Sequence, residues 1–400
     1  MANERVRFSE TNASVILDLV RGLAAMLVAV GHWRNIFFID YPTVAQQTPR
    51  LAHLLAVPYI VTSGGHQAVV LFFILSGYLI SGSVFRLLRA KTWRWGTYLS
   101  HRLVRLWVVL VPGLVLCAFW DNIGLRSGTA PNLYHGMASN HMIGNIATQL
   151  STKVFLGNLF FLSPIFVPTF GSDSALWSLP YEFWYYMLFP LGLLALRREF
   201  SWRTRALCAV GFLLVGWFVR GAILWMFPVW LLGTLLAMAK PPRIGVRTRL
   251  VAAAIYPPVL WCFAKQQWIS NGLYSDYAFG IVTALFLWLM LSAQAKANEQ
   301  GVVERGARQL SRFSYTLYVI HVPILVFAAG MVAGDDRWNP TLGHIAGALV
   351  LLLLTLLYSY GVAALTEFRT DRVRRFVERL LGNPDAAVRN PHETILNELH

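Results

Sequence analysis

The chain has 400 residues, of which 56% are hydrophobic and only 13% are charged, whereas about 25% of the residues of a soluble protein are charged. This composition excludes an ordinary soluble enzyme and is typical of a polytopic membrane protein. A formal net charge of +15 would suit a nucleic-acid-binding protein. However, the Lys and Arg residues form short clusters between apolar segments, as membrane topology places them. We therefore expect membrane lipids and no nucleic acid as partners.

The first apolar segment, residues 14–34, is long enough to cross a bilayer but contains Asp18, Arg21 and His32. An ionisable side chain at the centre of a span costs at least about 2.5 kcal/mol, so it usually has a partner or a function. Arg21 and His32 are eleven residues apart, which places them on nearly the same helix face about 16 Å apart. Asp18 precedes Arg21 by three residues and is placed to neutralise it, and an arginine paired in this way can still donate to a phosphate.

Further apolar segments predict an all-α, polytopic membrane bundle of about ten transmembrane helices. The predicted spans are residues 14–33, 66–86, 104–120, 176–196, 206–219, 222–239, 250–264, 277–294, 313–333 and 342–366. Residues 121–150 are predicted to form the longest outer loop, and residues 153–168 an interfacial or re-entrant segment. The basic tail, residues 371–400, is expected to begin with a short amphipathic surface helix. Ten spans place both termini on one side, and the distribution of Lys and Arg predicts that this side is cytoplasmic.

Glu182 lies inside the fourth predicted span, which runs antiparallel to the first. Counting residues from the outer face places Glu182 and His32 at similar depth. A histidine that meets a carboxylate at low dielectric is suited to act as a general base with an orienting partner. The alternative is that each side chain only bonds a backbone or tyrosine group for packing.

Other candidate residues carry weaker signals. His321, near the middle of the ninth span, is interpreted as a satisfied core histidine. Ser76 and Gly77 interrupt an apolar run and permit close helix packing. Ser76 lacks the G-x-S-x-G setting of a nucleophilic serine, so packing is the favoured interpretation over catalysis. No Walker A, G-x-G-x-x-G, H-E-x-x-H or zinc pattern occurs, so we expect no metal and no ATP-driven pump.

In five segments the chain resembles the membrane-bound acyltransferase 3 family. These segments are LDLVRGLAAMLVAVGHW, with the R-x10-H pair Arg21 and His32, FFILSGYLI, RLVRL, LWSLPYEFWYY and SRFSYTLYVIHVP. Their order and spacing extend over essentially the whole chain. The resemblance implies one acyltransferase domain, residues 1–370, in a bacterial inner (plasma) membrane.

The resemblance also implies an activity and a set of site residues. Such proteins move an acyl group, commonly acetyl, from acyl-CoA to a hydroxyl of a cell-surface or exported glycan, which can be lipid-linked. Carried over by position, His32 and Glu182 are the expected catalytic residues. Arg21, Arg102 and Arg105 are the expected acyl-CoA-binding residues.

Two mechanisms use these residues. In one, His32, held by Glu182, takes the proton of the acceptor hydroxyl; in the other, a covalent acyl-histidine hands the group across. The rival class is a secondary transporter of an anionic or acylated solute, which would also bury such residues near the midplane. A purely structural or sensory membrane protein would not need Arg21, His32 and Glu182 together.

Overall fold

The computed structural model describes residues 11–138, 143–265, 272–295 and 301–380. These residues form helices joined by turns, with no strands. Ten long helices of 17 to 33 residues make up the body of the molecule. They are α1 (Asn12–Phe37), α4 (Gly65–Arg89), α5 (Trp95–Ser127), α9 (Leu179–Leu196), α10 (Trp202–Val219), α11 (Ala222–Met238), α12 (Val246–Lys265), α13 (Gly272–Met290), α15 (Ser314–Val332) and α16 (Leu342–Leu365).

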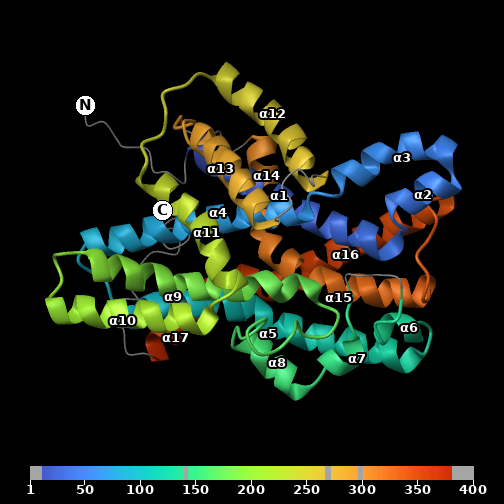
Figure 1. The fold of residues 1–400 in the computed structure, drawn as a ribbon, viewed down its shortest axis with the longest axis horizontal. Coiled ribbons are helices and arrows are strands. Elements are labelled where there is room, and N and C mark those ends of the chain that lie inside the picture. The colour runs from blue at the N-terminus through green and yellow to red at the C-terminus, as the bar shows by residue number, and fades with distance from the viewer. Residues whose placement is uncertain (1–10, 139–142, 266–271, 296–300, 381–400) are drawn as a thin grey trace.

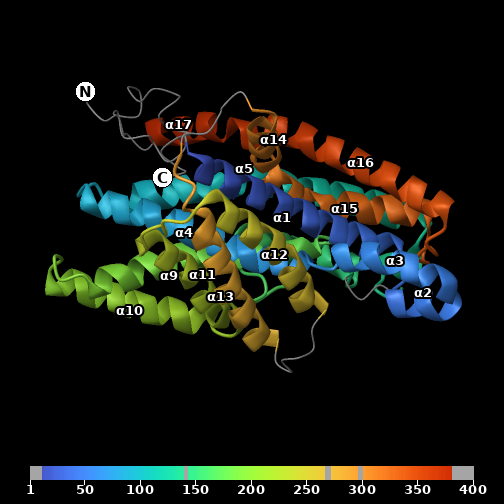
Figure 2. The same ribbon diagram turned by 90° about the horizontal axis from the view of Figure 1, so that it is seen from above.

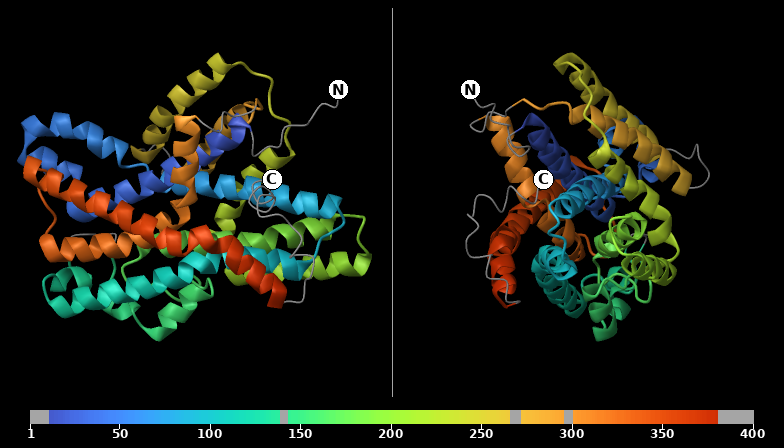
Figure 3. Two further views of the ribbon diagram at one scale, coloured as in Figure 1. Left: turned by 180° about the vertical axis from the view of Figure 1, so that it is seen from behind. Right: turned by 90° about the vertical axis from the view of Figure 1, so that its left-hand side faces the viewer.

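Shorter helices lie at the ends of this bundle and beside it. They are α2 (Tyr41–Gln47), α3 (Pro49–Val61), α6 (Pro131–Tyr134), α7 (Ile146–Gln149), α8 (Thr152–Leu159), α14 (Val302–Arg312), α17 (Thr370–Leu380) and the 3₁₀ helices η2 (Ser174–Ser178) and η3 (Glu367–Arg369). Most long helices run along the long axis of the molecule, while α2 and α3 lie at one end of it (Figure 1). Seen from above, α16 and α17 lie along one edge and α10 along the opposite edge (Figure 2). The end-on view shows the long helices gathered side by side in a single bundle (Figure 3).

The observed helices agree with the predicted all-α bundle, because each of the ten predicted spans falls on one long helix. Among the described residues, seven helices are long and apolar enough to cross a membrane, and α11 is a shorter apolar helix. The chain is therefore a multi-pass membrane protein. The count of ten spans and the cytoplasmic location of both termini stay predictions.

Local sequence explains where several helices begin. The Thr11 side chain accepts a hydrogen bond from the Ser14 amide at the start of α1, and Thr341 does the same for the His344 amide at the start of α16. Such caps satisfy amide groups that have no partner within the helix.

Helices α4 and α11 cross at very close range. A Cβ atom on Gly77 would lie 2.0 Å from the Trp230 carbonyl oxygen, and one on Gly233 would lie 2.1 Å from the Ile74 carbonyl oxygen. Because a side chain at either position would collide with backbone, the two glycines are what allow the helices to approach so closely. The predicted packing role of Gly77 is therefore confirmed.

Two helices differ from the prediction. The third span was predicted at 104–120, but α5 begins at Trp95 and ends at Ser127, so Arg102 and Arg105 lie within the helix and not at its start. Residues 302–312 were assigned to no helix, yet they form α14, which packs against α1. The expected helix of the basic tail is present as α17, and residues 381–400 of that tail lie outside the described residues.

Candidate active site

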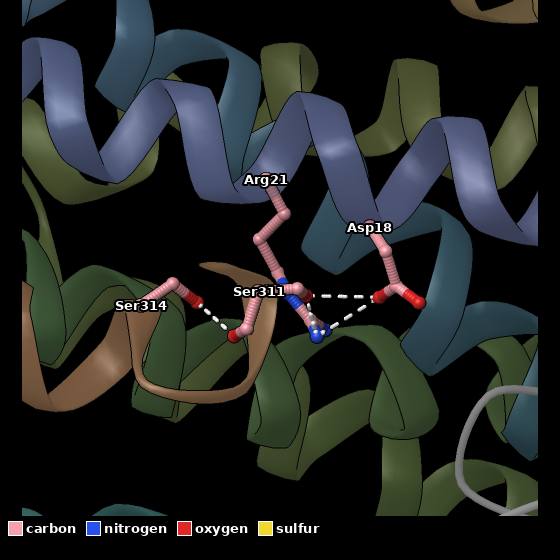
Figure 4. Close-up of polar contacts among 4 residues, drawn as sticks. All are labelled: Asp18, Arg21, Ser311 and Ser314. Carbon is pink, nitrogen blue, oxygen red and sulfur yellow. Dashed lines mark hydrogen bonds and ion pairs between the residues drawn. The ribbon is translucent and has the colours of Figure 1, made fainter. Parts of the chain in front are cut away.

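Arg21 and Asp18 form an ion pair on α1. Arg21 Nη2 donates to Asp18 Oδ1 at 3.1 Å and to Ser311 Oγ, and Ser311 Oγ donates to the same Asp18 oxygen at 2.9 Å. Figure 4 shows both charged side chains reaching from α1 to the turn between α14 and α15, where Ser314 Oγ donates to the Ser311 carbonyl. The predicted neutralising pair is therefore confirmed. Arg21 Nε, which is buried, has no hydrogen-bond partner among the described residues.

Arg21 lines an open cavity between α1, α4, α5, α9 and α15. Arg102, Arg105 and Glu182 line the same cavity. Four of the five predicted site residues are thus brought together in one space. Its remaining wall is mainly apolar and aromatic, with side chains from α4 and α15.

Arg102 is held at one end of this cavity. Its Nη2 donates to Ser83 Oγ at 3.2 Å, and its guanidinium carbon lies 5.6 Å from the centre of the Tyr98 ring. The side chain is 8% exposed, and within the described chain its Nε has no hydrogen-bond partner. A buried guanidinium with an unused donor beside a cavity is suited to bind phosphate or carboxylate oxygens.

Glu182, in the first turn of α9, is bound to α4 and to its own helix. Its Oε1 accepts hydrogen bonds from Ser76 Oγ at 3.2 Å and from the Tyr186 hydroxyl, and Trp230 Nε1 donates to the same Ser76 oxygen at 3.2 Å. Ser76 thus links three helices through hydrogen bonds. Such a link accords with the packing role predicted for Ser76.

His32 does not line the cavity, and its partner is a second histidine. His32 Nδ1 lies 2.8 Å from His321 Nε2, and the two rings are nearly parallel, with centroids 5.0 Å apart. The predicted contact between His32 and Glu182 is not formed in this structure. The physical reason is the direction of each face: α1 presents His32 to α15, whereas Glu182 bonds to α4 and α9.

The other nitrogen of His321 determines which protons this pair carries. His321 Nδ1 lies 2.8 Å from the Leu317 carbonyl oxygen, which can only accept a hydrogen bond. In a neutral ring, His321 Nε2 is therefore the acceptor, and His32 Nδ1 must carry the hydrogen that it receives. The consequence is that the lone pair of neutral His32 lies on Nε2, where it can accept a proton.

The sequence reasoning did not predict the role of His321 as the partner of His32. His321 is fully buried and hydrogen-bonded, so its interpretation as a satisfied core histidine is confirmed, but the histidine pair is an additional finding. A usable signal was the spacing: Ser311 and His321 are ten residues apart, and Arg21 and His32 are eleven apart. The segment that passes from the end of α14 into α15 meets α1 at both of these pairs.

Glu367 was also missed. It lies in η3, lines the cavity, and accepts hydrogen bonds from the Thr316 amide at 2.9 Å and the Thr316 hydroxyl at 2.7 Å. The cavity therefore combines three guanidinium groups with two carboxylates. No sequence signal distinguished Glu367 from other acidic residues near helix ends.

Comparison with known proteins adds independent findings. The family model of the acyltransferase domain, acyltransferase 3, matches residues 15–366. The chain is also 25% identical over 319 residues to an O-acetyl transferase of Shigella phage Sf6, in an alignment that spans 77% of this chain and 83% of the relative. No solved structure gives a significant match.

Proposed function

Because the chain belongs to the acyltransferase 3 family, we propose that it transfers an acetyl group from acetyl-CoA to a hydroxyl of a cell-surface or exported glycan. Membership of the family makes it an acyltransferase of the membrane, and its similarity to an O-acetyl transferase supports transfer to oxygen. The donor, the glycan acceptor and a location in the bacterial inner membrane are parts of the proposal. The observation that carries it is the histidine pair next to a cavity lined by three arginines.

The cavity supports a CoA-type donor. Arg21, Arg102 and Arg105 line it, and guanidinium groups bind phosphate oxygens through short, charge-assisted hydrogen bonds. The apolar wall of the cavity suits the uncharged arm that links the phosphates to the thioester. The donor would thus lie with its phosphates at Arg102 and its thioester near α15.

His32 is proposed to act as the general base. Its Nε2 takes the proton of the acceptor hydroxyl while the hydroxyl oxygen attacks the thioester carbonyl carbon. The new C–O bond replaces the C–S bond, and the thiolate of CoA leaves and receives the proton from His32. His321 acts as a positioning residue that fixes the ring and its tautomer, as second-shell acceptors do for other histidines.

The same residues can support an acyl-histidine intermediate, in which His32 Nε2 itself attacks the thioester carbonyl. In that order CoA leaves before the acceptor reacts. A burst of free CoA in the absence of acceptor would identify this order.

The test compares the full-length wild-type protein with His32→Ala, each purified in detergent and supplied with acetyl-CoA and a panel of bacterial surface glycans. We expect acceptor-dependent release of free CoA from the wild type. We expect a rate at least about 10²-fold lower in the variant, because general-base catalysis contributes about 10²- to 10⁴-fold. His53→Ala removes an exposed imidazole from α3 and serves as the matched control. Normal turnover by His32→Ala would contradict the proposed role of His32.

A further inference from the structure

Two aromatic rings lie in the wall of the cavity nearest the histidine pair. Phe72 on α4 and Tyr318 on α15 both line it, and they meet edge to face with ring centroids 5.9 Å apart. The Tyr318 ring also contacts His321, with centroids 6.4 Å apart, and His321 bonds His32. Neither histidine lines the cavity. The two rings therefore separate the cavity from the histidine pair.

Phe72 also contacts the part of α1 between Arg21 and His32. Its ring packs against a small buried cluster formed by Ala25, Ala29 and Leu317. Ala29 lies three residues before His32, or about one helical turn. The Phe72 ring therefore lies between the cavity and the turn of α1 that precedes His32.

The two rings differ in how firmly they are held. The Tyr318 hydroxyl hydrogen-bonds Ser178 Oγ at 2.6 Å and the Ala175 carbonyl at 3.0 Å, which ties it to η2. Phe72 has no polar atom in its side chain and is held only by apolar contacts. Phe72 is thus the member of the pair whose size can be changed without breaking a hydrogen bond.

The position of Phe72 corresponds to the acyl end of a donor in the cavity. Arg102 is bound to Ser83, and Phe72 precedes Ser83 by eleven residues on the same helix. At 1.5 Å per residue this separation is about 16 Å along α4, which is of the order of an extended pantetheine arm. A donor with its phosphates at Arg102 would therefore bring its thioester and acyl group to Phe72 and Tyr318.

We propose that Phe72 is a specificity-determining residue that limits the acyl group to two carbons, an inference that rests on the proposed function. Its ring fills the space that the third and fourth carbons of a longer acyl chain would need. Packed interiors give way little to extra methylene groups, since forcing one in costs about 1 to 3 kcal/mol. A longer acyl group would thus be kept from reaching His32 in a reactive position.

The experiment measures kcat/KM of the full-length protein with acetyl-, propionyl- and butyryl-CoA, using free-CoA release and one fixed acceptor glycan. For the wild type we expect acetyl to be favoured over propionyl by about tenfold or more, because one misfitting methylene changes the rate by about 10- to 200-fold. Phe72→Ala should lower this ratio by about tenfold or more. Phe72→Leu should change it in the same direction, and Phe72→Trp should lower transfer of all three groups.

Leu79→Ala is the matched control. Leu79 lies on the same helix and lines the same cavity nearer Arg102, so its truncation enlarges the cavity away from the proposed acyl end. We expect this variant to keep the wild-type ratio between donors, whatever its rate. A ratio that shifts as much in Leu79→Ala as in Phe72→Ala would overturn the assignment to Phe72.

The outcomes also distinguish this inference from the proposed function. An acetyl-to-propionyl ratio that is unchanged in active Phe72→Ala or Phe72→Leu protein overturns the role of Phe72 alone. If the wild type releases no CoA from any of the three donors, the proposed function is wrong and the inference falls with it.

Discussion

Arg21 and His32 lie on the same helix, eleven residues apart, but their surroundings differ. Arg21 faces the cavity, where Asp18 and Ser311 bind it and the carboxylates of Glu182 and Glu367 share the space. His32 does not line the cavity, and its hydrogen-bond partner is the imidazole of His321 instead of a carboxylate. A fixed charge needs opposite charge or water to balance it, whereas a base needs one lone pair held in place. Under the proposed function, donor binding and proton transfer therefore take place at separate positions along α1.

Of the variants that test this difference between the two regions, His321→Ala, which removes the hydrogen-bond partner of His32, is expected to lower kcat the most. Without His321 Nε2 to accept its hydrogen, His32 Nδ1 loses the partner that fixes its tautomer and ring orientation. We expect kcat to fall by about 10²-fold, a substantial part of what a general base contributes. The KM for acetyl-CoA should change little, because His321 does not line the cavity. Steady-state rates of CoA release provide both constants.

His321→Gln is the conservative control for that prediction. Its side-chain carbonyl can accept the hydrogen from His32 Nδ1, so this variant should recover at least part of the lost rate. If His321→Ala and His321→Gln both turn over at the wild-type rate, His321 does not position His32.

The positions of the helices along the chain could be predicted from the sequence, but the contacts between helices could not. Apolar length alone located all ten long helices, and the cost of burying charge singled out Arg21 and His32. Depth counting did not identify the partner of His32, because depth alone does not determine which neighbouring helix a side chain faces. The structure shows α14 packed beside α1, so that α15 begins next to Arg21 and its His321 reaches His32. The alignment of one helix against another depends on the side chains at their contact. The apolar pattern of a single helix therefore does not determine it.

Arg21→Ala tests the role of the cavity. We expect this variant to weaken the binding of CoA and to change kcat little. Loss of one charge-assisted hydrogen bond to a phosphate is worth about 1.5 to 3 kcal/mol, so the Kd for CoA should rise by about tenfold or more. The kcat at saturating donor should change much less than in His321→Ala. Calorimetric titration of CoA into the full-length protein measures the affinity.

Two variants control for the other role of Arg21, which is to balance Asp18. Asp18→Asn/Arg21→Gln removes both charges, so it should fold normally and still bind CoA weakly. Arg126→Ala removes an exposed arginine from the end of α5 and should leave CoA affinity unchanged. Wild-type affinity in Arg21→Ala would remove the proposed role of Arg21 in binding the donor.

The smallest effect on kcat is expected for Glu182→Gln. This variant tests whether the cavity and the histidine pair act separately. A glutamine can keep an oxygen acceptor for Ser76 and Tyr186, the groups that bind Glu182 now. Since a neutral hydrogen bond contributes only about 1 kcal/mol, kcat should fall by less than about fivefold. Removing a negative charge from among the arginines should also strengthen CoA binding slightly. Glu199→Gln, at an exposed position after α9, is the matched control for both measurements. A loss of rate in Glu182→Gln as large as that in His321→Ala would mean that Glu182 acts with His32 during the reaction, and that the cavity and the histidine pair work as one site.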